Sequence, residues 1–443
     1  MNKAAEGHLT KKEAFFAMQS LLLFIIGATS RLDFALVGRT TIGEMIAFAA
    51  IPILWISQPD LRRNSHFVKV FSILAMIVVA VWIADFINKM PLWFSMRSAA
   101  RPIFMGLWVL FFIPIIRKNI NIIKYFIYGA VIAGAMNYFR PSVFETEAAA
   151  DVQTYAGIVF RLSPLIGALT LAGVFYIYPR SRVLAALIVL SNGVVGIAMG
   201  GARSSFINYF AIACLLLLIA WFRSGMKRKR MEITPRKIAL IGCVGMVALT
   251  MVYGAYIYAA PQGYLGEEQR AKFETQRNTA LGVNPLGFIL GGRTQVYGAL
   301  LGIMDRPILG FGSWNREATY PYVIEAIASV GTDPKVLEHM MNSGGIMGAG
   351  HSILFQTWVE NGIIPAIGYM MLYGILCRVL LFNIRYEGRI TPLIVMWFVS
   401  YSWAYLFSPP SFLFRLHFGL VLAIYIVFMD KKQAMGRPVL LDK

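Results

Sequence analysis

Hydrophobic segments of roughly 16 to 25 residues recur along almost the whole chain. The apolar core of a bilayer is about 30 Å thick, which a helix of roughly 20 apolar residues crosses. In lipid every backbone polar group must be hydrogen-bonded within the protein, so such segments are expected to be helical. Hydrophobic residues make up 58% of the chain and charged residues 14%, which excludes a soluble domain of ordinary size. The sequence therefore predicts an all-α membrane protein.

We expect about twelve membrane-spanning helices, with both chain ends in the cytoplasm. The expected helices lie near residues 14–29, 42–57, 70–87, 102–116, 125–139, 157–178, 183–201, 204–222, 238–258, 353–377, 391–407 and 412–429. A long segment of mixed polarity separates the ninth helix from the tenth. The chain thus divides into an N-terminal bundle over 1–258, an extracytoplasmic cap over about 259–351, and C-terminal helices with a cytoplasmic tail over 352–443.

The net charge of +19 would suit a protein that binds nucleic acid, but the positions of the charges favour another explanation. If the N-terminus is cytoplasmic, most of the 41 lysines and arginines fall on cytoplasmic segments, including the run RSGMKRKR that begins at Arg223. Membrane proteins concentrate basic residues on that side. We therefore expect no nucleic-acid partner, and the same parity places the cap outside the cytoplasm.

The three cysteines give no sign of a metal centre or of a disulfide framework. Cys214, Cys243 and Cys377 lie in or at the edge of hydrophobic segments, and the chain has no CxxC pattern. No metal and no cofactor are expected. The first hydrophobic segment lacks a small-residue cleavage site, so we interpret it as a retained helix rather than a signal peptide.

Within the cap, Arg293 follows two glycines and precedes a segment with helical periodicity, residues 294–304. An arginine beside free backbone amides at a helix N-terminus suits a phosphate group. Gly310 and Gly312 then force a turn. Trp314, just after this turn, could stack on a sugar face or insert into lipid.

His351 stands at the end of the cap, immediately before the next hydrophobic segment. An imidazole at the water boundary can exchange a proton near neutral pH, although a single histidine is more often structural or simply exposed. Ser352 is placed to cap the helix that follows, and Glu360 lies about two and a half turns along it.

Arginines near the outer ends of the hydrophobic segments are further candidates. Arg203 lies in the short connection between two expected helices, where it contributes to a site or contacts lipid headgroups. Arg97 and Arg101 are among the charged residues of the other outward segments. They could rim a site, but solvation is the simpler interpretation.

Taken in order, these motifs resemble the O-antigen ligase and polymerase superfamily of bacterial membrane glycosyltransferases. The residues that carry the resemblance are GGARSSF around Arg203, Arg293 followed by Pro307, Gly310 and Gly312, and His351 heading a helix with Glu360 and Gly362. The resemblance covers the topology of most of the chain and the motifs of its second half. Ser352 is a departure, because many members have Asn after the histidine.

The resemblance implies a C-type glycosyltransferase-like fold and metal-independent glycan transfer on the periplasmic face of the bacterial inner membrane. Arg203 and Arg293 would bind the diphosphate of an undecaprenyl-diphosphate-linked glycan, and His351 would deprotonate or orient the acceptor hydroxyl. The other residues implied in substrate binding are Gly310, Gly312, Trp314 and Glu360. The implied partners are the lipid-linked glycan, an acceptor glycolipid, membrane lipids and a membrane protein that regulates chain length.

The acceptor distinguishes a polymerase, which extends a lipid-linked repeat unit, from a ligase, which transfers the glycan to the phosphate-rich lipid A core. The cap has seven basic and eight acidic residues, so it offers no strongly positive platform for the core, and this favours the polymerase. A transporter or flippase for lipid-linked sugars is the alternative of another class. It would need ionisable groups at mid-membrane and paired internal repeats, and neither stands out in the sequence.

Overall fold

The structure is a computed structural model, and it describes residues 11–36, 38–56, 64–139, 155–198, 203–224, 253–264, 294–329, 352–386, 388–408 and 413–435, with isolated positions between 243 and 277. Most of these residues are helical. Five of the described segments are long and apolar enough to cross a membrane. They are α3 (Ser65–Ile87), α4 (Leu92–Ile116), α5 (Ile123–Phe139) with the preceding turn η2 (Ile120–Ile122), α17 (Ile363–Tyr386) and α19 (Leu413–Met435).

Six further apolar helices coincide with predicted spans. They are α1 (Lys11–Thr29), α2 (Ile42–Trp55), α7 (Tyr155–Ile177), α8 (Arg182–Ala198), α9 (Arg203–Ser224) and α18 (Thr391–Phe407). The prediction of a helical membrane protein is therefore confirmed. The helix expected near 238–258 lies mostly outside the described residues, so the count of twelve spans stays a prediction.

α4 and α19 form the centre of the bundle. In their apolar windows 72% and 78% of the residues are buried, against 39% in α3. Trp108 of α4 is fully buried and its ring stacks on Phe112, with the ring centroids 5.3 Å apart. α3 instead leaves large apolar side chains such as Trp82 and Phe86 exposed, a surface that suits lipid rather than water.

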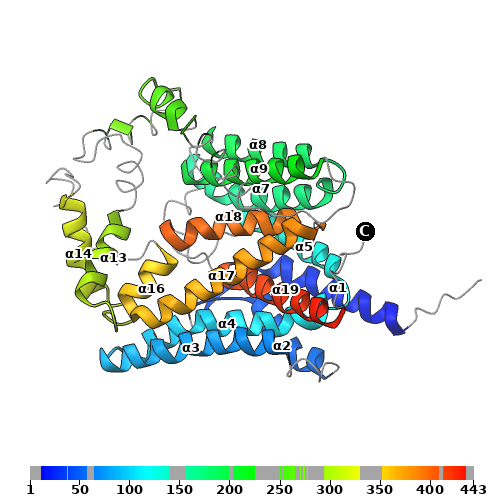
Figure 1. Ribbon diagram of the computed structural model, residues 1–443, viewed down its shortest axis with the longest axis horizontal. Helices are drawn as coiled ribbons and strands as arrows, with labels where there is room; N and C mark the ends of the chain where they lie inside the picture. The colour runs from blue at the N-terminus through cyan, green and yellow to red at the C-terminus, as the bar shows by residue number, and fades with distance from the viewer. Residues whose placement is uncertain are drawn as a thin grey trace, which may run out of the picture.

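The other helices pack side by side around this centre, some beside their neighbours in sequence and some beside helices far away in sequence (Figure 1). α2 and α3 pack on α4, and α17 packs on α3. α1, α5, α7, α8 and α9 form a second row, each in contact with the next, and α18 joins α9 to α17. Short connections favour the contacts between consecutive helices, because they leave these helices antiparallel and adjacent.

The two ends of the bundle differ in what they carry. α1 begins and α19 ends at one end, where Arg117 and Asp430 form an ion pair at 3.3 Å. Three short helices lie at the opposite end (Figure 1): α13 (Thr294–Asp305), α14 (Arg316–Ser329) and α16 (Ile353–Asn361). Two of these helices, α13 and α14, belong to the predicted cap, and α16 directly follows it.

The segment after α1 forms a two-stranded antiparallel hairpin of β1 (Asp33–Leu36) and β2 (Gly38–Thr41), which the sequence analysis does not predict. Thr41 then caps α2: its hydroxyl accepts a hydrogen bond from the Glu44 amide, and the Glu44 carboxylate accepts one from the Thr41 amide. The Glu44 carboxylate also pairs with the guanidinium of Arg415 at 2.5 Å, and both side chains are almost fully buried. This pair ties the start of α2 to α19.

Two helices differ from their predicted bounds. α4 begins at Leu92, well before the predicted start near 102. The prediction excluded the first turns because they contain Arg97 and Arg101, which line a pocket instead of facing lipid. The prediction of one span over 353–377 is wrong. The chain there forms α16 and α17, which are separated at Gly362, where φ is +83°.

Candidate functional site

The chain between α13 and α14, residues 306–315, is a tight turn that we call the cap turn. It packs against the end of α16, where the Gly312 amide donates a hydrogen bond to the Glu360 carbonyl at 2.7 Å. Gly310 and Gly312 have φ of +64° and +92°, and a Cβ on Gly310 would lie 2.6 Å from the backbone of Glu360. Only glycine tolerates both the positive φ and this close approach to another backbone segment. The two glycines therefore allow the cap turn to approach α16 closely.

A small hydrophobic core, separate from that of the bundle, holds the cap turn between the short helices. Its buried members are Ala299, Ile303, Phe311, Val323, Ile327 and Val359. Because they come from α13, the cap turn, α14 and α16, these four elements are positioned by one another.

The cap turn is also tied to the end of α3. Asp85 accepts a hydrogen bond from the Ser313 amide through Oδ1 at 2.6 Å, and the Asn361 side-chain amide donates to the Ser313 hydroxyl at 2.7 Å. All three side chains are buried. Asp85 Oδ2 has no hydrogen-bond partner among the described residues. Three segments that are far apart in sequence thus meet at one buried polar junction.

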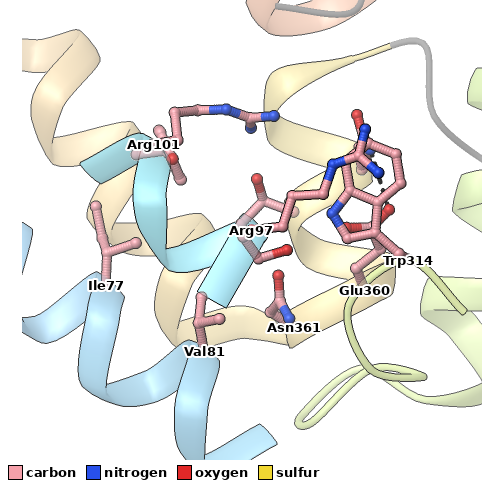
Figure 2. A pocket seen from close by; sticks show the side chains of 11 residues that line it. Ile77, Val81, Arg97, Arg101, Trp314, Glu360 and Asn361 are labelled. Carbon is pink, nitrogen blue, oxygen red and sulfur yellow. Dashed lines mark hydrogen bonds between the residues drawn. The ribbon is translucent and has the colours of Figure 1, made fainter. Parts of the chain in front are cut away.

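A pocket opens beside this junction, between α3, α4, α16, α17 and the cap turn (Figure 2). It contains about 380 Å³ of empty space, counting its open mouth. The polar and aromatic side chains that matter most in it are Arg97, Arg101, Trp314, Gln356, Glu360 and Tyr369. This space includes open solvent, and the cavity proper is about 20 Å³. The lining of the pocket, rather than its size, therefore indicates the kind of ligand.

Arg97 and Arg101 are one helical turn apart on α4 and therefore share a face. Figure 2 shows the Arg97 side chain reaching the Trp314 ring, with the guanidinium carbon 3.8 Å from the ring centroid. Arg101 extends over the pocket from the next turn. Within the described part of the chain, neither arginine forms an ion pair with a carboxylate.

Trp314 is held in an unusual backbone conformation. Its φ is +58°, in the left-handed region that side chains other than glycine seldom adopt. The guanidinium of Arg316 lies 5.6 Å from the ring centroid, in addition to the contact with Arg97. Strained residues of this kind persist where the surrounding structure fixes them, and they concentrate at functional sites.

Glu360 faces the same pocket from α16. Its carboxylate accepts a hydrogen bond from the Gln356 side chain at 3.0 Å. Part of the residue remains accessible, but burial of the carboxyl group raises the pKa of Glu360 above its ordinary value. The hydrogen bond from Gln356 and the charge of Arg101 oppose this effect and are smaller. The carboxyl group therefore keeps its proton to higher pH than a solvated one.

The structure brings together four of the residues that the sequence predicts for the site: Gly310, Gly312, Trp314 and Glu360. Trp314 and Glu360 line the pocket, and the two glycines form the turn that places Trp314 there. Arg203 opens α9, but its side chain lies outside the described residues. Arg293 and His351 lie outside them as well, so the convergence of these three residues stays a prediction.

Two local predictions beside the undescribed residues are confirmed. The helix expected over 294–304 is α13, which begins directly after Arg293. Ser352 caps α16, because its hydroxyl accepts a hydrogen bond from the Phe355 amide at 3.1 Å. The same hydroxyl donates to the Tyr405 carbonyl at 2.5 Å, which joins the start of α16 to α18.

The sequence does not single out Arg97 and Arg101, although both line the pocket. Their spacing of four was the available signal, since it places both on one face of a helix. The signal was lost because the first turns of α4 were interpreted as part of a solvated loop. Asp85 is a second omission, and its position near the end of an apolar segment gave no indication that it would be buried beneath the cap turn.

Within the part of the chain that the structure describes, no three His, Cys, Asp or Glu side chains lie close enough together to hold a metal ion. No protein-family model matches the chain, and no curated protein is significantly similar to it.

Proposed function

We propose that the protein is a membrane glycosyltransferase of the O-antigen ligase and polymerase superfamily that polymerises lipid-linked polysaccharide repeat units. The observation that carries this proposal is the pocket at the cap end of the bundle. Trp314 and Glu360, which the motif pattern assigns to substrate binding, both line it although they come from separate segments. Arg97 and Arg101 add positive charge. An aromatic face, a carboxyl group and guanidinium groups are suited to a sugar linked to a diphosphate.

In the proposed reaction, a hydroxyl of the acceptor sugar attacks the anomeric carbon of a glycan carried on undecaprenyl diphosphate. The bond from that carbon to the diphosphate oxygen breaks, and undecaprenyl diphosphate leaves with the electron pair. His351 takes the proton of the attacking hydroxyl, while Arg203 and Arg293 stabilise the charge on the leaving diphosphate. Direct displacement of this kind inverts the anomeric carbon.

The proposed setting is the bacterial inner membrane, with the cap and the pocket on the periplasmic side. A polymerase is preferred to a ligase because the cap is close to neutral, with seven basic and eight acidic residues. The acceptor would then be a second lipid-linked repeat unit rather than the lipid A core.

Arg293→Ala and His351→Ala are expected to abolish transfer while the protein remains inserted in the membrane. Loss of a single group that stabilises developing charge costs about 10²- to 10³-fold in rate. The assay is reconstitution of the purified protein with a lipid-linked oligosaccharide, alone or with a lipid A core acceptor, followed by separation of the products by length. Longer product without the core acceptor indicates a polymerase, and product that requires it indicates a ligase.

Matched controls exist in the same segment of the chain. Arg306→Ala removes an exposed arginine of the cap turn, and His339→Ala removes the other histidine of the cap segment. Both variants should retain the wild-type product length. Wild-type product length in Arg293→Ala or His351→Ala would contradict the proposed mechanism.

A further inference from the structure

The cap end of α4 carries two guanidinium groups to which the proposed reaction assigns no step of its own. Arg97 and Arg101 line one pocket, and no carboxylate of the described chain forms an ion pair with either. Glu360 is the one acidic side chain among the described lining residues. Burial favours its neutral form, so it balances the arginines only in part. The pocket therefore has an excess of positive charge that favours an anion.

The arrangement of the two arginines favours a phosphate group as the ligand over the carboxylate of a peptide side chain. Their side chains come from adjacent turns of one helix, and both line the same pocket, so both forks of donors can reach a ligand that enters it. The guanidinium of Arg97 lies over the face of the Trp314 ring. This contact leaves the guanidinium N–H groups available for oxygen ligands.

The pocket also has an apolar and aromatic part that comes from membrane-spanning helices, beside the uncharged polar groups of Ser98, Gln356, Thr357 and Asn361. Ile77 and Val81 come from α3, and Tyr369 comes from α17 (Figure 2). A ligand with phosphate oxygens attached to an apolar chain would contact both parts of the pocket. A free ion would contact the arginines alone, so the lining as a whole suits an amphiphile.

We infer that this pocket binds the phosphate or diphosphate group of a membrane lipid, with Arg97 and Arg101 as the anion ligands and Trp314 as the residue that positions Arg97. The recognition of phosphate stands on the pocket alone. The identification of the lipid as a polyprenyl diphosphate rests on the proposed function.

The test is binding of defined lipids to the full-length protein in phosphatidylcholine nanodiscs, measured by native mass spectrometry. The probes are undecaprenyl diphosphate, undecaprenol, phosphatidylglycerol and inorganic diphosphate. Undecaprenyl diphosphate should bind at least about tenfold more tightly than undecaprenol, because charge-assisted hydrogen bonds to the diphosphate are lost in the alcohol. Arg97→Gln and Arg101→Gln should each weaken its binding by about tenfold or more.

Two variants make the comparison specific. Lys89→Gln removes one exposed positive charge from the connection between α3 and α4, outside the pocket, and should leave the affinity unchanged. Glu360→Gln removes the acidic side chain of the pocket and should bind undecaprenyl diphosphate more tightly than the wild type, because a carboxylate repels the diphosphate. Thermal unfolding is recorded for each variant first. Where a Gln variant does not fold, Arg97→Lys or Arg101→Lys replaces it and should retain part of the affinity.

The outcomes separate this inference from the proposed function. Equal binding of phosphatidylglycerol and undecaprenyl diphosphate, lost in the arginine variants, would support a phosphate site for lipid headgroups in general and detach it from glycan transfer. Wild-type affinity for every probe in both arginine variants overturns the inference, as does equally tight binding of inorganic diphosphate. His351→Ala, which should lose transfer, is expected to bind undecaprenyl diphosphate normally, so the two claims can fail independently.

Discussion

Glu360 illustrates how the surroundings of a single residue set its charge. Its backbone carbonyl accepts the hydrogen bond that docks the cap turn, while its side chain shares a pocket with two arginines. Burial disfavours the carboxylate, and the neighbouring cation favours it, with burial the stronger effect. Ionisation of this group therefore opposes the packing of the cap against α16.

This balance predicts a pH dependence of stability. Because the pKa of Glu360 is raised in the folded protein, its contribution to stability is fully present below the ordinary carboxyl pKa and is lost as pH rises through the raised value. The melting temperature of the wild type should therefore fall relative to that of Glu360→Gln as the pH rises above the ordinary carboxyl pKa of about 4. Thermal unfolding in detergent over a series of pH values measures the difference.

Glu317→Gln provides the control for this experiment, since Glu317 is an exposed carboxylate of α14. It should show the same pH dependence as the wild type. Parallel curves for the wild type and Glu360→Gln would show that burial of the Glu360 carboxyl group has no effect on stability.

At the level of the secondary-structure elements, the break between α16 and α17 depends on close contact with the cap turn. Gly362 has φ of +83°, and a Cβ there would lie 1.9 Å from the Ile308 carbonyl oxygen. The Ile363 amide donates a hydrogen bond to the same carbonyl at 3.2 Å. The kinked chain thus presents its backbone to the cap turn, which a continuous helix could not do.

Gly362→Ala should destabilise the protein by at least about 1–2 kcal/mol, because a left-handed backbone conformation disfavours any Cβ and the added methyl group meets a backbone carbonyl. Gly374→Ala is the matched control: Gly374 lies in α17, and a Cβ there would meet nothing within 4 Å. That variant should be neutral or more stable by up to about 1 kcal/mol. Thermal unfolding and limited proteolysis of the cap compare the two, and equal behaviour would exclude a requirement for glycine at 362.

The sequence predicts which helices exist far better than where they end. The segments of α3, α5 and α18 are mostly apolar over their predicted bounds, so hydrophobicity alone locates them. The start of α4 was misplaced because its first turns contain charged residues that a pocket, and not water, accommodates. The break at Gly362 was missed because its cause is a tertiary contact with the cap turn, which local sequence does not show.

Over the whole molecule, the ionic and polar features divide between the two ends of the bundle. The pair of Arg117 and Asp430 lies at the end where α19 finishes, whereas the polar junction of Asp85, Ser313 and Asn361 lies at the other, under the cap turn. The buried pair of Glu44 and Arg415 lies near the starts of α2 and α19, and the two charges satisfy each other. This polarity along the long axis is what a membrane orientation requires.

The orientation can be tested by labelling single cysteines in a background in which Cys214, Cys243 and Cys377 are replaced by serine. Lys89→Cys and Glu317→Cys should react with a membrane-impermeant maleimide in intact spheroplasts, because both residues are exposed at the cap end. Lys118→Cys, exposed at the other end of α4, should react only after lysis. The reverse pattern would place the cap in the cytoplasm and contradict the proposed periplasmic site.

The sequence predicted site residues only where they are also turn residues or lie next to a turn. Gly310 and Gly312 were recognisable as turn residues. Trp314 was predicted as a site residue because it lies directly after this turn. The pocket itself was not predictable, because it depends on side chains from α4 and on a buried contact to α3 that joins residues more than two hundred positions apart. Such pairings are set by how the helices pack, which hydrophobic patterns do not encode.

The left-handed backbone of Trp314 has a consequence for how this chain can change. A residue without a Cβ, or an asparagine, would relieve a strain of about 1–3 kcal/mol at this position. Either exchange would also remove the indole that rests against Arg97. Stability and ligand binding therefore favour different residues at position 314. Selection for a higher melting temperature alone would replace Trp314 and so remove the indole that contacts Arg97.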